Sequence, residues 1–481
     1  DLNLCDRRQR QMCIRDSITM VLSATVAWNS LPGWMYHAQT PPPDRAFDAS
    51  LSGITWVDLV FPFFLFAMGA AFPFSIKKRF EKGDTKLRLV YEAIKRGVQL
   101  TFFAIFIQHF YPHVLSNPQD VRAWLLSILC FIILFPMFIR IPLKMPDWMR
   151  TVIKVTAYVI AIVLLLTTQY TNERTFDVSF SNIIILLLAN MAVFGSVIYI
   201  FTMQNLRARI GILLILMALL LSGQVENSWT QAVYTYTPLP WVFHFEYLQY
   251  LFIVIPGSIA GEYLMGWLKQ HNDSCVESTD KWKAIIMILL TLAIIIVNLA
   301  GLYTHCTVLN LIINIPLLIS GVFLLRKGTG FIKLWRELFI AGAFLVILGL
   351  CFEPFQEGIK KDPATFGYLF LTSGLAFMAL LLLNVICDYF RCVKSTRFLV
   401  MPGQNPMMAY VVGDLLIIPV INLLGIASLL AYFNENAWMG FLRGVVLTAL
   451  SVLVTMFFTR IKCFWSCLLY TSDAADDRIS V

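Results

Sequence analysis

The stretch ITWVDLVFPFFLFAMGAAFPFSIKK, residues 54–78, decides the fold. From Val60 to Ile76 it holds no charged residue. A run of roughly 20 apolar residues is long enough, as a helix, to cross a hydrocarbon layer about 30 Å thick. Asp58 stands near the start of this run, and Lys77 follows its end. We therefore interpret residues 54–76 as a transmembrane helix with a titratable side chain at its mouth.

Similar apolar runs recur along the whole chain. Of its 481 residues, 58% are hydrophobic and 14% charged, whereas a soluble domain averages roughly 25% charged residues. A soluble core is therefore excluded, and we predict an all-α, polytopic transmembrane helical bundle of 12–14 spans. The expected spans are 18–36, 54–76, 97–115, 122–140, 150–168, 182–203, 208–223, 245–268, 284–303, 308–326, 334–353, 367–388, 402–430 and 438–460, the next to last broken by its prolines.

The basic residues predict the orientation of these spans. The loop 77–96 carries eight Lys or Arg residues, and we take it as cytoplasmic. Alternating from there, the inner loops carry 26 basic residues and the outer loops five, as the positive-inside rule requires. We expect a bacterial cytoplasmic (inner) membrane with residues 37–53 on the extracytoplasmic side. Because topology explains the net charge of +8, nucleic acid is not an expected partner.

Both ends of the chain differ from the rest. Residues 1–17 are polar, and residues 466–481 break off a helical pattern abruptly. RQMCIRDS and LLYTSDAADD resemble translated sequencing-adaptor sequence. We interpret both segments as non-native and assign residues 18–462 to one transmembrane domain.

Titratable residues gather before the span that begins at residue 54. His37 adjoins three consecutive prolines, and Asp44, Asp48 and Asp58 follow it. An imidazole titrates near about pH 6.5 and suits proton transfer, which a carboxylate can assist by orienting the ring. We predict that His37 is a general base oriented by Asp48 or Asp58. Equally open is a structural role for Asp58, in which its carboxylate caps the start of the helix. Pro62, four residues later, has no N–H and so leaves the backbone carbonyl of Asp58 without its helical hydrogen bond.

Two later stretches carry further candidates. Lys360 and Lys361 are the only paired basic residues in an outer loop, so we expect them to bind an anionic group. Neutralisation of both lysines by Glu357 and Asp362 is the alternative. MPGQNPMMAYVVGD, residues 401–414, predicts non-helical backbone at membrane depth, where it must line a cavity or be buried in protein.

The sequence motifs of other common enzyme classes do not occur in this chain. The chain has no Walker loop, GxGxxG, GxSxG or HExxH, and its ten cysteines are scattered without CxxC spacing. Nucleotide hydrolysis, dinucleotide redox chemistry and zinc chemistry therefore have no support, and we expect no metal site.

Three blocks of sequence resemble one known family. SGITWVDLVFPFFLFAMGAAFPFSI, GIKKDPATFGYLFLTSGLAF and PGQNPMMAY, together with Arg96 at the start of the third span, are similar to the heparan-alpha-glucosaminide N-acetyltransferase family, and most closely to its bacterial members. The resemblance covers most of residues 18–462. It implies acyl transfer across a membrane, with acetyl-CoA as donor and a terminal amino sugar or glycan as acceptor.

The resemblance also implies a catalytic histidine in the loop before DLVFP. In the matching segment, DASLSGIT, its place is taken by Asp48, so we expect His37 to replace it through folding back of the loop. We expect Arg96, Lys360 and Lys361 to bind the donor. Gln404 and Asn405 are, with Lys361, candidate donors to the thioester oxyanion.

Two other functions remain open. A permease or flippase for a sugar or lipid-linked glycan would also need many spans with buried carboxylates. A non-catalytic relative would explain the absence of histidine at position 48. The lipid bilayer is an expected partner in all three cases, and a homodimer is left open.

Overall fold

The computed structural model describes residues 21–22, 25, 31–44, 46–139, 146–271, 281–328, 330–391, 401–433 and 436–465. Regular elements in these residues are all helical, and eleven helices are long and apolar enough to cross a membrane. The predicted all-α polytopic bundle is therefore confirmed. The segments 1–17 and 466–481, interpreted as non-native, lie outside the described residues.

The helices follow the chain with short connections. Their bounds are α2 (Val60–Phe72), α3 (Lys78–Glu81), α4 (Lys86–His109), α5 (Pro112–Leu115), α6 (Val121–Phe138), α7 (Asp147–Thr167), α8 (Ile183–Thr202), α9 (Leu206–Ser222), α10 (Trp229–Tyr234), α11 (Leu251–His271), α12 (Lys281–Tyr303), α13 (Thr307–Leu324), α14 (Phe331–Phe352), α15 (Phe366–Asn384), α17 (Pro406–Val412), α18 (Ile418–Leu423), α19 (Ala427–Tyr432) and α20 (Ala437–Arg460).

Helices account for every predicted span after the first. Besides the eleven long apolar helices, α4 and α9 occupy the predicted spans 97–115 and 208–223. The first half of α4 is rich in charge, and α9 has 17 residues, which explains why neither is among the eleven. The predicted span 18–36 lies largely outside the described residues. The predicted break of the span 402–430 at its prolines is not observed. The helix runs from Pro406 to Leu423 through a π-helical segment, Gly413–Ile417, and ends at a turn before α19.

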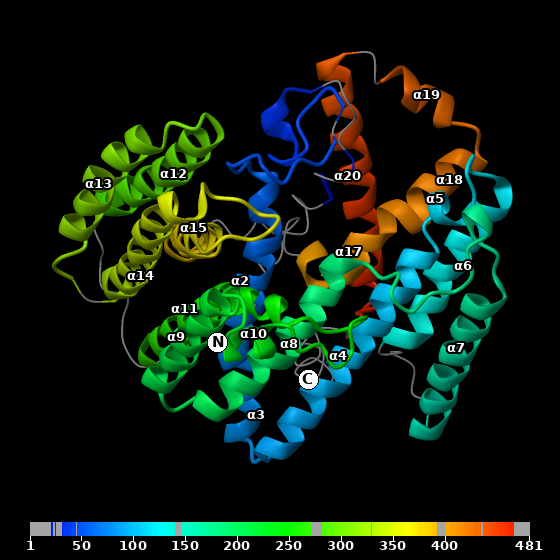
Figure 1. Ribbon diagram of the computed structural model, residues 1–481, viewed down its shortest axis with the longest axis horizontal. Helices are drawn as coiled ribbons and strands as arrows, with labels where there is room; N and C mark the ends of the chain where they lie inside the picture. Colours follow the sequence, from blue (N-terminus) through cyan, green and yellow to red (C-terminus); the bar gives the residue numbers. More distant parts are fainter. Residues whose placement is uncertain are drawn as a thin grey trace.

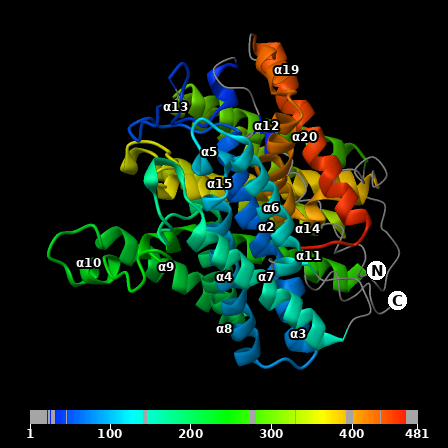
Figure 2. The same ribbon diagram turned by 90° about the vertical axis from the view of Figure 1, so that its right-hand side faces the viewer.

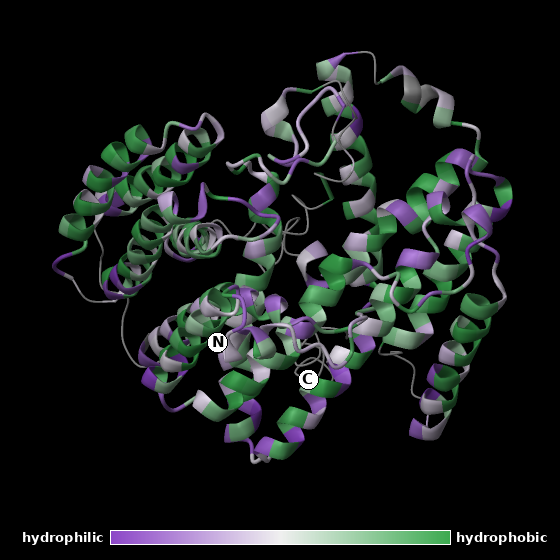
Figure 3. Ribbon diagram, viewed as in Figure 1, coloured by the Kyte–Doolittle hydropathy of each residue, from purple (hydrophilic) through white to green (hydrophobic). Residues whose placement is uncertain are grey.

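Two helices form the centre of the bundle. Helices α2 and α15 are the most deeply buried of the long apolar helices, and α11, α8 and α14 pack around them (Figures 1 and 2). The outer helices α7, α13 and α20 instead expose large apolar side chains, and Figure 3 shows hydrophobic residues along them. Such surfaces suit contact with lipid, so the centre is the place for polar chemistry.

Glycines bring α2 and α11 into close contact. A Cβ atom at Gly257 would lie 2.2 Å from the carbonyl oxygen of Phe66, and one at Gly261 would lie 2.3 Å from that of Ala70. This GxxxG spacing puts both glycines on one face of α11, where small residues let two membrane helices approach closely. The close approach fixes α2, and with it the polar turn that precedes this helix.

Candidate active site

Two loops far apart in the sequence meet above the start of α2. Gly53 N–H donates to Ile359 O at 2.8 Å. The fully buried side chain of Gln39 makes a two-way amide pair with the backbone of Asp362: its Nε2 donates to the carbonyl at 2.6 Å, and its Oε1 accepts from the N–H at 3.0 Å. These bonds set the register of the loop containing Lys361 against the loop containing His37.

Asp58 lies at the centre of this junction. It belongs to the 3-10 turn Val57–Leu59 and is 1% exposed. Its Oδ2 accepts from Thr55 N–H at 2.9 Å, from Ala38 N–H at 3.2 Å and from the Thr55 hydroxyl at 3.2 Å. None of these donors belongs to α2, so the carboxylate organises the preceding loop and does not cap the helix.

His37 faces the other oxygen of this carboxylate. Its Nε2 lies 3.2 Å from Asp58 Oδ1 and 3.6 Å from Asp362 Oδ2. Its Nδ1 accepts the Gln39 N–H at 3.0 Å, so the neutral ring carries its proton on Nε2. Nδ1 is therefore the nitrogen that can accept a proton, and in the structure it accepts the backbone N–H of Gln39.

Asp58 Oδ1 is poised to stabilise positive charge. The atom is buried and has no aligned hydrogen bond among the described residues. Besides His37, the Lys361 ammonium lies 3.9 Å away. The carboxylate is thus directed at the His37 ring and at the Lys361 ammonium.

Asp362 forms the more open side of the cluster, with half of its side chain exposed. Burial raises the pKa of this carboxyl, but the neighbouring His37 ring and the charge of Lys361 lower it, and the net pKa lies below the ordinary value. Asp362 is therefore ionised at neutral pH. The cluster holds two carboxylates around one ammonium and one imidazole.

The backbone carbonyl of Asp58 lacks its helical hydrogen-bond donor, as the sequence predicts. Pro62, four residues on, has no N–H to offer it. The Tyr368 hydroxyl of α15 takes the place of that donor, at 2.7 Å from the carbonyl oxygen. The prediction of a freed carbonyl is confirmed, and the replacement bond fastens the polar turn to the central helix.

A cavity of about 140 Å³ opens beside the cluster. Lys361 belongs to both, because its side chain lines the cavity and its ammonium lies 3.9 Å from Asp58. The other lining residues come from the start of α2, from α8 and from α17: Val57, Val60, Phe61, Phe64, Ile184, Ile185, Leu188, Pro406, Met407 and Tyr410. The polar cluster thus leads directly into an apolar chamber within the bundle.

The non-helical segment predicted around residue 402 borders this chamber. Pro402–Gln404 form a 3-10 turn, and Pro406 and Met407, which follow it, line the cavity. Asn405 is fully buried, and its Nδ2 donates to Thr459 Oγ1 and Cys463 O. The structure therefore uses Asn405 to anchor the end of α20, whereas Gln404, the other amide of this turn, is half-buried.

The other candidate residues lie outside the cluster. Asp48 is exposed, and its Oδ1 accepts from the N–H and the hydroxyl of Ser50, while Asp58 is the carboxylate that contacts His37. Lys360 bonds Thr365 through its backbone and lies near Asp48, whose pKa it helps to lower. Arg96 is buried in the half of α4 that begins at Lys86, roughly 20 Å along the helix from its other end.

His109, the histidine at the end of α4, is an internal anchor. Its Nδ1 lies 2.8 Å from Ile105 O, and its Nε2 accepts the Asp177 N–H at 3.4 Å. The ring is 2% exposed and is packed by Tyr170, Phe176 and Phe180. Its ring is enclosed in an aromatic cage, whereas the side chain of His37 is 18% exposed, so His109 is the weaker candidate for a base.

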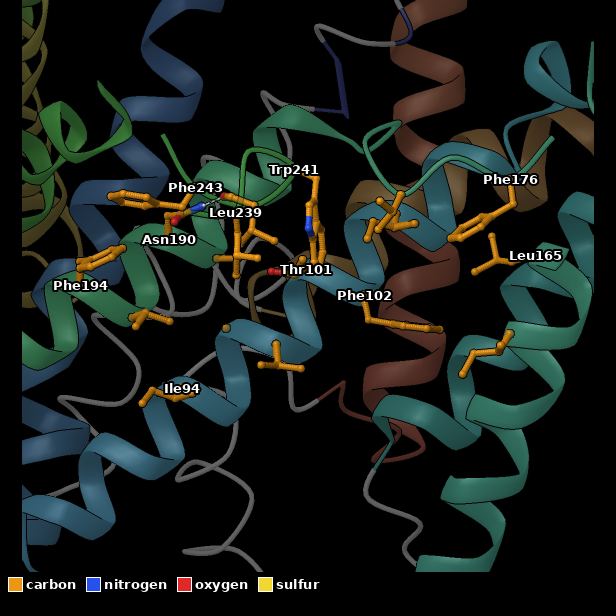
Figure 4. Close-up of a pocket in the computed structure, with 18 of the residues that line it drawn as sticks. Ile94, Thr101, Phe102, Leu165, Phe176, Asn190, Phe194, Leu239, Trp241 and Phe243 are labelled. Carbon is orange, nitrogen blue, oxygen red and sulfur yellow. Dashed lines mark hydrogen bonds between the residues drawn. The ribbon is translucent and has the colours of Figure 1, made fainter. Parts of the chain in front are cut away.

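A larger cavity, of about 530 Å³, lies between α4, α7 and α8 (Figure 4). Its walls are almost entirely apolar, and Asn190, one of its few polar residues, donates to Val242 O at 2.8 Å. It contains no titratable side chain among its lining residues in the described part of the chain. The smaller cavity is the better candidate for an active site, because only that one adjoins the charged cluster.

Sequence reasoning missed two members of the site. Gln39 belongs to no recognisable sequence motif, although it stands two residues after His37. Its hydrogen-bond partner, Asp362, lies 323 residues away in the sequence. Asp362 was considered only as a counter-charge for the lysines, but it contacts His37 as well.

Comparison with protein families gives one match. Residues 10–264, just over half of the chain, match a domain of unknown function, DUF5009. The matched region contains His37, Asp58, α2 and α8, and it ends before Lys361. No curated protein matches the chain. By this match, the chain belongs to the DUF5009 family.

Proposed function

We propose that this protein is a membrane-embedded acyltransferase, which moves an acetyl group from acetyl-CoA to an amino sugar or glycan on the extracytoplasmic side of the bacterial inner membrane. The observation that carries the proposal is the pairing of His37 with Asp58, 3.2 Å apart and beside Lys361, which lines an apolar cavity. A carboxylate beside one imidazole nitrogen is typical of a general base, whose other nitrogen, Nδ1, would exchange the Gln39 N–H for the acceptor group during the reaction.

Each residue of the cluster then has a role. Nδ1 of His37 removes a proton from the acceptor amine or hydroxyl as this group attacks the thioester carbonyl, and Asp58 stabilises the imidazolium. Lys361 stabilises the negative charge that develops on the carbonyl oxygen, an interaction that is strong where water is excluded. The C–S bond breaks as the tetrahedral intermediate collapses, and the imidazolium returns its proton to the thiolate of CoA.

The direct test offers labelled acetyl-CoA and a panel of amino sugars to the purified protein. Mass spectrometry should find the label on an acceptor with wild type and not with Asp58→Asn. If wild type labels no acceptor, the proposal fails, and a non-catalytic relative becomes the better interpretation.

A permease is the second candidate, because the helix Pro406–Leu423 contains a π-helical segment that carries the intramembrane carboxyl of Asp414. Such π segments inside membrane helices, and intramembrane carboxyls, are both frequent at functional sites. Uptake of unmodified sugar into vesicles containing the protein, without acetylation, would favour this function over acyl transfer.

The proposed orientation has its own test. Ser50→Cys and Thr85→Cys, made singly in a background without exposed cysteines, report on the two sides of the membrane. A membrane-impermeant thiol reagent should label Ser50→Cys in intact cells and Thr85→Cys only after lysis. The reverse pattern would overturn the orientation, which rests on the 26 basic residues of the inner loops against five in the outer loops.

A further inference from the structure

We propose that the cavity between α2, α8 and α17 receives the acyl group of the donor, and that it accepts linear acyl groups of up to about six carbons. The inference rests on the proposed function and extends it to the class of acyl group. The cavity measures about 140 Å³, close to the roughly 150 Å³ of an apolar cavity that binds benzene. An acetyl group would leave most of this space empty.

The cavity has one polar end. Lys361, the charged residue among its lining, extends to within 3.9 Å of Asp58 and so marks the end where the reacting carbonyl would lie. The hydroxyl of Tyr410, the other polar side chain of the lining, donates to Asn182 Oδ1 at 3.2 Å. The remaining walls are apolar and suit an alkyl chain that points away from Lys361.

The helix directions identify the floor of the cavity. Val57 and Ile184 line it near the cluster, at the starts of the 3-10 turn before α2 and of α8. Phe64 and Leu188 line it further along the same two helices. The seven residues from Val57 to Phe64 correspond to roughly 10 Å of helix. Phe64 and Leu188 should therefore set the longest chain that fits.

Hydrophobic burial predicts a preference among donors. Each additional buried methylene group should improve kcat/KM by a factor of about four until the cavity is full. Butyryl-CoA should therefore react with a kcat/KM at least equal to that of acetyl-CoA and up to about 15-fold higher. Octanoyl-CoA should lose at least tenfold relative to hexanoyl-CoA, because two further methylene groups would overfill the cavity and strain its walls, and this cost exceeds what their burial contributes.

The experiment measures kcat/KM for acetyl-, butyryl-, hexanoyl- and octanoyl-CoA with wild type and two variants. Leu188→Phe places a larger side chain at the closed end of the cavity and shortens it. This variant should lower the ratio of kcat/KM for hexanoyl-CoA to kcat/KM for acetyl-CoA about tenfold. Ile183→Phe, on an exposed face of the same helix, is the matched control and should leave this ratio unchanged. Equal effects of both variants, or a wild type that transfers acetyl and rejects butyryl, would overturn the inference while leaving the proposed function standing.

A second readout does not depend on turnover. Leu188→Cys should be protected from a small alkylating reagent by hexanoyl-CoA and not by CoA, whereas Ile183→Cys should be protected by neither. Protection of Leu188→Cys without any acyl transfer by the parent protein would keep the acyl pocket and reject the proposed reaction. No protection, or a bilayer lipid found in the cavity in place of the donor, would reject the pocket.

Discussion

Two buried charge clusters in this bundle show how differently a membrane protein can use ionic groups. In the first, Arg209 is fully buried and donates to Glu262 Oε1 at 2.9 Å, to both oxygens of Thr202 and to the Ser258 hydroxyl. Its guanidinium also lies 4.6 Å from the centre of the Tyr199 ring. The cluster joins α8, α9 and α11, and the hydrogen bonds of the Arg209 guanidinium hold these three helices together.

The second cluster, around His37, is left open. Asp58 Oδ1 has no aligned hydrogen bond among the described residues, half of the Asp362 side chain is exposed, and a cavity adjoins Lys361. A buried charge is costly in free energy unless it is paired. A buried carboxylate oxygen that makes no hydrogen bond within the protein therefore points to a place where a ligand binds or a reaction occurs. The difference suggests a structural role for the first cluster and a chemical role for the second.

Removal of the charge at Asp58 should have the largest effect. Asp58→Asn keeps the shape of the side chain but removes the charge that stabilises the imidazolium, so acyl transfer should fall by about 10²–10⁴. Asp48→Asn, a matched change in the same loop, should leave the rate within about twofold, because Asp48 contacts Ser50 and not His37. Similar losses for both variants would remove the distinction between these two carboxylates.

Breaking the first cluster should affect stability instead. Arg209→Met leaves Glu262 without its partner in the bundle, which typically costs about 3–5 kcal/mol. Denaturation in detergent should show this loss, and the double variant Arg209→Met/Glu262→Leu should recover part of it. Transfer per folded molecule should stay near the wild-type value, so a specific loss of rate would mean that this cluster also takes part in chemistry.

The two lysines of the later loop should differ from each other. Lys361→Met removes an interaction with a developing charge worth about 1.5–3 kcal/mol, so the rate should fall about 10- to 100-fold. Lys360→Met should cost far less, because the bonds of Lys360 in the structure are those of its backbone to Thr365. Equal losses would return the pair to a shared role in binding an anion.

The smallest effect concerns acid stability. The folded protein holds the pKa of Asp362 below its ordinary value of 3.8, so its contribution to stability is fully present above that value and is lost as pH falls through the lowered pKa. Thermal unfolding between pH 6 and pH 2 should show a slightly steeper acid loss for wild type than for Asp362→Asn. Identical curves would mean that Asp362 is not coupled to the cluster.

The sequence predicted the helices better than the site. Long apolar runs indicate spans by themselves, and Pro62 indicated a free carbonyl at Asp58, because both effects act within one helix. The contacts of His37 with Asp362, and of Lys361 with Asp58, depend on how α2 and α15 pack. Asn405 was predicted to donate to the thioester oxyanion. Its motif indicates burial but not its hydrogen-bond partners, which in the structure lie at the end of α20.

The most direct test of the account is the rate at which label passes from acetyl-CoA to an amino-sugar acceptor with His37→Ala, measured by mass spectrometry beside wild type. The account predicts a fall of about 10²–10⁴, with donor binding and stability in detergent nearly unchanged. Undiminished transfer by His37→Ala would contradict it, because the base would then lie elsewhere and the cluster around Asp58 would be structural.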